Sequence, residues 1–144
     1  MVDVGEKIPT RRTATARSIV YLPEVIMQKI SGGELHSAKG AVFQTAVVAG
    51  IMAAKKTGEL IPLCHPLGMD NCNINIEVYD KNHVVIECTA TITAKTGIEM
   101  EALVGASIAA LTIYDMCKAM SHEIVIKETK LVAKTGGKSD FRCA

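Results

Sequence analysis

The chain has 144 residues, and this length predicts a single domain over residues 1–144. Hydrophobic residues make up 49% of the sequence but aromatic residues only 3%, so the core must consist of aliphatic side chains. A formal net charge of +1 argues against general binding to nucleic acid or to a membrane surface, because both need a strongly basic face.

Five cysteines without CxxC spacing indicate free thiols rather than a disulfide framework. Residues 1–6 lack the basic and apolar regions of a signal peptide. The longest apolar run, over 102–114, is too short to cross a bilayer. We therefore expect a cytoplasmic protein that has no membrane partner.

The first half of the chain predicts one strand followed by helices. Alternating residues over 14–21 predict the strand. Pro23 suits the first turn of a short helix that continues to about Ile30. Apolar residues at helical spacing predict a longer helix over about 39–56, which Thr57 and Gly58 should end.

The second half predicts a hairpin, a helix and a last strand. Alternation over 73–79 and 84–92, with a turn-like segment between them, predicts the hairpin. A helix should follow over about 98–120, and a strand over 123–133. The order strand, helix, strand, strand, helix, strand predicts the ferredoxin-like α+β fold (βαββαβ), an antiparallel sheet with helices on one face.

The helix over 98–120 is apolar on nearly all sides between residues 102 and 111, so one sheet cannot cover it. Glu101 and Asp115 lie on this helix and are separated by roughly 21 Å at 1.5 Å per residue. They either serve separate sites or meet through a neighbouring subunit. We favour a homo-oligomer with composite sites.

Ionisable residues at both ends of this helix are candidates for chemistry. Asp115 and Lys118 share a face and form either a surface ion pair or an acid–base pair. Glu99 and Glu101 either complement the helix dipole or belong to a site at its first turn. The tetrapeptide Ala-Lys-Thr-Gly occurs at 94–97 and again at 133–136, by chance or as two corners that bind anions.

His65 lies between Pro62 and Pro66, so it is either a hydrogen-bonded loop residue or a titrating group held in place. Zinc is a poor alternative, because only Cys72 and His36 are nearby candidate ligands. The neighbouring Cys64 lacks the partner pattern of a nucleophile.

The segment Lys134–Ser139 is not a P-loop, because Val132 stands where the motif requires Gly and no helix follows. It is either a solvated tail or a cationic strip that holds phosphates. Together with Arg12, Lys39 and Lys138, these groups suit acid–base rearrangement of a phosphorylated small molecule.

Several long motifs resemble the molybdenum cofactor biosynthesis protein C family, the cyclic pyranopterin monophosphate synthases. The matching strings are MVDV at 1–4, KG at 39–40, AGIMAAKKT at 49–57, LIPLCHPL at 60–67, KTGIEMEAL at 95–103, ALTIYDMCK at 110–118 and KTGGKS at 134–139. They follow the same order as in the family and cover essentially the whole chain.

The resemblance implies a ferredoxin-like subunit in a homo-hexamer, a trimer of dimers with active sites at the dimer interface. It implies conversion of (8S)-3′,8-cyclo-7,8-dihydroguanosine 5′-triphosphate to cyclic pyranopterin monophosphate with release of diphosphate, a lyase reaction. We expect no cofactor or resident metal, and the sequence leaves open whether Mg²⁺ assists the diphosphate.

The resemblance also assigns residues. Lys39, Asp115 and Lys118 match the catalytic positions of the family. The expected substrate-binding residues are Cys64, His65, Glu99, Met100, Glu101, Arg12, Lys134 and Lys138. Ala41 is a departure, because many members have Asp after the Lys-Gly pair.

The sequence gives less support to two other functions. A ligand-sensing module would bind the triphosphate unchanged, since ferredoxin-like folds often bind small molecules without reacting them. RNA binding on the sheet needs stacking aromatic residues, and Phe43 and Phe141 are the only phenylalanines. We expect no nucleic-acid partner.

Overall fold

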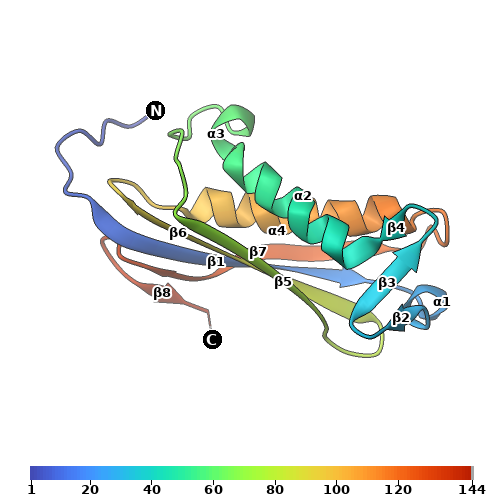
Figure 1. Ribbon diagram of the computed structural model, residues 1–144. Coiled ribbons are helices and arrows are strands. Elements are labelled where there is room, and N and C mark those ends of the chain that lie inside the picture. The colour runs from blue at the N-terminus through green and yellow to red at the C-terminus, as the bar shows by residue number, and fades with distance from the viewer. Residues whose placement is uncertain (144) are drawn as a thin grey trace.

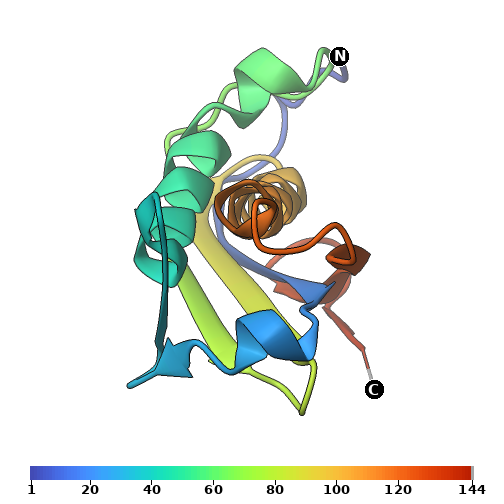
Figure 2. The ribbon, with the colours of Figure 1, turned by 90° about the vertical axis from the view of Figure 1, so that its right-hand side faces the viewer.

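The computed structural model describes residues 1–143 and has one main sheet covered on one face by two long helices (Figures 1 and 2). The strands of the main sheet are β1 (Thr10–Tyr21), β5 (Asn71–Val78), β6 (His83–Ala94), β7 (Val125–Thr135) and β8 (Phe141–Arg142). The long helices are α2 (Val42–Lys55) and α4 (Glu99–Cys117). The shorter elements are α1 (Glu24–Met27), β2 (Ile30–Ser31), β3 (Glu34–Ser37), β4 (Gly40–Ala41) and α3 (Thr57–Leu60).

The strand order in the main sheet is β5-β6-β1-β7-β8, and all neighbouring strands are antiparallel. β1 lies between β6 and β7, although most of the chain separates it from β7. The order β1, α2, β5, β6, α4, β7 is the predicted βαββαβ arrangement. The ferredoxin-like α+β fold with helices on one face is therefore confirmed.

The core between sheet and helices is aliphatic, as the composition predicts. Alternate residues of β1 and β6 point toward the helices, and Val20, Ile86 and Cys88 are fully buried. α2 and α4 pack so closely that a Cβ added at Gly50 would lie 2.7 Å from the carbonyl oxygen of Gly105. The glycines of these helices therefore permit the close packing of α2 against α4.

The segment before α2 differs from the prediction. The predicted helix start at residue 39 is wrong, because residues 30–41 form the small sheet β2-β3-β4 and α2 begins at Val42. Gly40 has a φ of +113°, which is incompatible with a helix and closes the turn between β3 and β4. α2 ends at Lys55, as expected, but another helical turn, α3, follows across Thr57 and Gly58.

Helix α4 is 19 residues long with a mean hydropathy of 1.3, so by length and composition alone it could cross a membrane. Half of its apolar stretch is buried within the fold, where it packs against α2 and the sheet (Figure 2). Within one subunit α4 is therefore half buried, with Glu101 buried in its first turn and Asp115 exposed in its last turn.

Candidate active site

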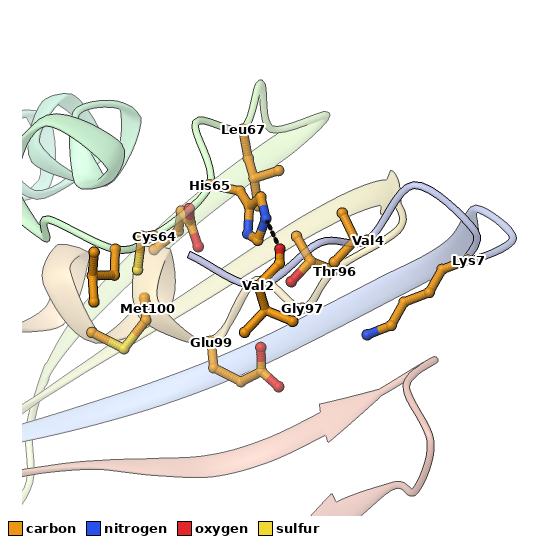
Figure 3. Close-up of a pocket in the computed structure, with 12 residues that line it drawn as sticks. Val2, Val4, Lys7, Cys64, His65, Leu67, Thr96, Gly97, Glu99 and Met100 are labelled. Carbon is orange, nitrogen blue, oxygen red and sulfur yellow. Dashed lines mark hydrogen bonds between the residues drawn. The ribbon is translucent and has the colours of Figure 1, made fainter.

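The N-terminal end of α4 borders a pocket of about 370 Å³ (Figure 3). Its walls are the first turn of α4, the loop after α3, the loop before α4 and the N-terminal segment. Four predicted substrate residues are brought together there, namely Cys64, His65, Glu99 and Met100, and the buried Glu101 joins them.

His65 is held by the N-terminal segment. Its Nε2 lies 2.7 Å from the carbonyl oxygen of Val2. Figure 3 marks this hydrogen bond with a dashed line. A carbonyl oxygen only accepts hydrogen bonds, so Nε2 carries the hydrogen and Nδ1 is the acceptor when the ring is neutral. Of the two predicted roles for His65, the structure therefore shows that of a hydrogen-bonded loop residue.

Glu101 is the most buried carboxyl group of the pocket, with an exposed fraction of 3%. This burial raises its pKa, and the nearby charge of Glu99 raises it further. Burial, followed by repulsion from Glu101, also raises the pKa of Cys64. The pocket thus raises the pKa of both groups, which makes each of them a weaker acid than it is in water.

A second, smaller hollow adjoins this pocket and shares Gly97 and Glu99 with it. Arg12 and Lys134 line it, and Nζ of Lys134 lies 3.1 Å from Oε1 of Glu99. Nε of Arg12 donates to the carbonyl oxygen of Ala94 at 3.1 Å. Arg12 and Lys134 therefore lie beside the predicted substrate residues at this end of α4.

The repeated tetrapeptides lie at the C-terminal ends of β6 and β7, the two strands that flank β1 in the sheet. Lys95 donates to the carbonyl oxygen of Gly5 at 3.1 Å, whereas Lys134 pairs with Glu99. The two lysines therefore make different contacts. Of the two, only Lys134 lines the hollow beside the predicted substrate residues.

The three predicted catalytic residues meet at the C-terminal end of α4, where Asp115 lies in the last turn, Lys118 directly follows the helix and Lys39 reaches them from the turn between β3 and β4. Nζ of Lys39 lies 2.7 Å from Oδ2 of Asp115, and Nζ of Lys118 lies 3.0 Å from Oδ1. The hydrogen bonds from Lys39, and then those from Lys118, hold the pKa of Asp115 below its ordinary value. Asp115 is therefore a carboxylate that holds two ammonium groups beside each other.

The predicted site residues thus form two clusters within one subunit. His65, Glu101 and their neighbours surround the start of α4, whereas Asp115 lies at its far end, roughly 21 Å along the helix. Lys138 lies in the turn between β7 and β8, and within residues 1–143 it forms no ion pair. The tertiary structure therefore gathers all predicted residues except Lys138 into these two groups.

Lys7 is a pocket residue that the sequence did not reveal. It lines the first pocket together with Val2 and Val4, and is drawn with them in Figure 3. No motif marks Lys7, since its segment has no regular structure and is placed by contacts of His65 and Lys95 with the backbone.

The metal ligands considered from the sequence do not meet. His36 lies in β3, whereas Cys72 lies in β5 beside Cys88, with the sulfur atoms 3.7 Å apart. Across the described part of the chain, no three His, Cys, Asp or Glu side chains are grouped as metal ligands.

The sequence matches the family model described as MoaC family over residues 1–137. The chain belongs to the MoaC family. It is 52% identical over 144 residues to the cyclic pyranopterin monophosphate synthase of Xanthomonas axonopodis pv. citri, an alignment that covers 100% of this chain and 87% of that protein. The resemblance predicted from the motifs is therefore confirmed.

Two other relatives are also similar to nearly the whole of this chain. The cyclic pyranopterin monophosphate synthase of Desulfitobacterium hafniense is 49% identical over 139 residues, which cover 96% of this chain and 84% of that protein. The molybdenum cofactor biosynthesis bifunctional protein of Synechocystis is 51% identical over 144 residues, covering 97% of this chain but 42% of that longer protein.

Proposed function

We propose that this MoaC family member is a cyclic pyranopterin monophosphate synthase of molybdenum cofactor biosynthesis. It would convert (8S)-3′,8-cyclo-7,8-dihydroguanosine 5′-triphosphate to cyclic pyranopterin monophosphate and release diphosphate, which makes it a lyase. The observation that supports this most is the pair of charged clusters at the two ends of α4, since one suits phosphates and the other suits proton transfer.

The cluster around Asp115 is suited to the triphosphate. Lys39 and Lys118 are each about half exposed, so their ammonium groups can turn from the carboxylate toward an anion. Positive charge beside the departing diphosphate stabilises the negative charge that develops on it. Asp115 would orient the two lysines, and Lys118 would also exchange protons during the rearrangement.

The pocket at the start of α4 is suited to the purine-derived part of the substrate. Glu101 has a raised pKa and can donate a proton, while Nδ1 of a neutral His65 can accept one. Glu99, Met100 and Cys64 would contact the ring system, and Arg12, Lys134 and Lys138 would add positive charge. Both proton acceptors and proton donors are thus available for opening and reclosing the ring.

One subunit does not bring these clusters together, so we propose composite sites in a homo-oligomer. A dimer interface would join the start of α4 from one copy to the end of α4 from another, and three dimers would form the hexamer. Apolar residues on the outer faces of the helices support such contacts, since Val48, Met52 and Leu111 are each about half exposed.

The remaining expectations belong to the same proposal. The reaction would need no resident cofactor, because proton transfer and loss of diphosphate require only acids, bases and positive charge. Mg²⁺ brought with the triphosphate would be part of the substrate. A small molecule would be the only ligand, without nucleic acid or membrane partners, and the enzyme would act in the cytoplasm, where free thiols are stable.

The direct test is to incubate the purified protein with the cyclic triphosphate and to measure both diphosphate and the pterin product. Stoichiometric formation of both products supports the synthase. Binding of the triphosphate without its conversion would instead support the ligand-sensing alternative. RNA binding has no support from Phe43, because this side chain is only 5% exposed and packs in the core.

A further inference from the structure

The N-terminal end of α2 is capped by a side chain from another element of the fold. Ala41 occupies the capping position and has no side-chain acceptor for the free N–H groups of the first turn. The carboxylate of Glu34, in β3, supplies the acceptors instead. Its Oε1 accepts from the N–H of Phe43 at 2.7 Å, and its Oε2 accepts from the N–H of Gln44 at 3.0 Å.

These two N–H groups belong to the second and third residues of α2, which a capping side chain at position 41 would normally satisfy. Glu34 therefore takes the place of a capping side chain at position 41. Its negative charge also lies at the end of α2 where the helix dipole favours an anion.

Glu34 is itself held firmly in β3. The N–H of Leu35 donates to Oε1 at 2.7 Å, and the Leu35 side chain is completely buried. Burial alone would raise the pKa of Glu34, but the three backbone hydrogen bonds outweigh it and hold the pKa below its ordinary value. The carboxylate therefore remains charged at neutral pH and ties β3 to α2.

The segment between Glu34 and the start of α2 contains Lys39. β3 pairs with β4 through His36 with Ala41 and Ser37 with Gly40, and Lys39 lies in the turn between them. The N–H of Lys39 donates to Oγ of Ser37 at 3.1 Å, which further restricts the turn. From this turn the Lys39 side chain reaches Asp115 on α4.

We propose that Glu34 is a positioning residue, which orders the first turn of α2 and thereby holds the β3–β4 turn so that Lys39 reaches Asp115. Glu34 would act through the backbone and would not touch the substrate. The inference rests on the proposed synthase activity for its effect on catalysis, but the ordering of the turn can be measured without substrate.

The test compares Glu34→Ala with the double variant Glu34→Ala/Ala41→Asp. The single variant should lose about tenfold or more in kcat, because a small displacement of a catalytic group is costly. Asp at position 41 can accept from the same N–H groups, so the double variant should recover most of the lost kcat.

Two matched variants separate positioning from general effects. Ile86→Val weakens the core in the middle of β6, and it should lower the melting temperature while leaving kcat unchanged. Glu59→Gln removes an exposed carboxylate from α3 and should change neither quantity. The proposal is overturned by a normal kcat in Glu34→Ala, by an equal loss in Ile86→Val, or by a double variant as slow as the single one.

Hydrogen exchange of the substrate-free protein keeps the inference separate from the proposed function. Residues 37–44 should exchange faster in Glu34→Ala than in the wild type, and Ala41→Asp should restore their protection. Unchanged exchange in Glu34→Ala would refute the ordering role. If exchange responds as expected but the wild type forms no product, the synthase proposal fails while the ordering of the Lys39 turn by Glu34 stands.

Discussion

The ammonium group of Lys39 lies 2.7 Å from Oδ2 of Asp115, although 76 residues separate them in the chain. The other carboxylate oxygen, Oδ1, binds Lys118 at 3.0 Å. Asp115 thus uses one oxygen for each lysine and keeps two like charges close together. The three side chains are half exposed, so an incoming triphosphate can compete for both cations.

Asp115→Asn should reduce kcat by about 100-fold or more, as expected for loss of a group that orients acid–base and charge-stabilising residues. The amide keeps the size of the side chain but removes the charge that holds Lys39 and Lys118. The rate of diphosphate release at saturating substrate measures the effect.

Asp80→Asn is the matched control, because Asp80 pairs with His83 at the turn between β5 and β6, away from both clusters. It should leave kcat unchanged. Near-normal activity in Asp115→Asn would contradict the assignment of Asp115 to the site.

Lys118→Ala should also remove measurable turnover while leaving the melting temperature and the proposed oligomer unchanged. The half-exposed ion pair with Asp115 adds little to stability, because water screens it. Size-exclusion chromatography and the product assay on the same sample distinguish loss of catalysis from loss of the oligomer. A variant that is inactive because it has dissociated or unfolded would not support a catalytic role.

Mixed oligomers of two inactive variants should recover activity if the sites are composite. In a dimer of one Asp115→Ala copy and one Glu101→Ala copy, one site would contain both native residues and the other neither. Random pairing should then restore about a quarter of the wild-type activity. Refolding the two variants together and measuring diphosphate release tests this prediction, with each variant refolded alone as the control. No recovery would show that Glu101 and Asp115 of a single copy serve each site, or separate sites.

Glu101→Gln should increase stability relative to the wild type as the pH rises above about 4.5, the ordinary value for Glu. Because burial raises its folded-state pKa, the folded protein keeps a proton on Glu101 that the unfolded chain has already lost. Stability of the wild type therefore falls as pH rises from the unfolded pKa to the folded pKa, whereas Gln has no such proton. Melting temperatures of both proteins between pH 4 and pH 8 give the comparison. Parallel curves would exclude a raised pKa for Glu101.

Gly50→Ala should destabilise the fold by about 1–3 kcal/mol through overpacking between α2 and α4. The added Cβ would meet the carbonyl oxygen of Gly105 at 2.7 Å, and backbone cannot move aside as a flexible side chain can. Urea unfolding of the two proteins measures the difference. Gly68→Ala is the control, because a Cβ there has open space, and it should leave stability nearly unchanged.

The sequence was sufficient to predict β1, β5, β6 and β7 of the main sheet and both long helices, because their hydrophobic periodicity is strong. It did not predict β8, which has only two residues. It missed the small sheet β2-β3-β4, whose strands of two to four residues are too short to show a period. For the same reason the role of Glu34 was invisible, since its three hydrogen bonds depend on where β3 lies relative to α2.

The sequence alone determined the MoaC family, the fold class and the residue types available for chemistry. Hydrophobic periodicity and motifs involve residues that are close together in the sequence, so they can be recognised without the structure. Only the tertiary structure decided which of these residues meet. It brought Lys39 to Asp115 and Lys134 to Glu99. Such contacts join residues far apart in sequence, so they arise from the packing of strands and helices and from no local pattern.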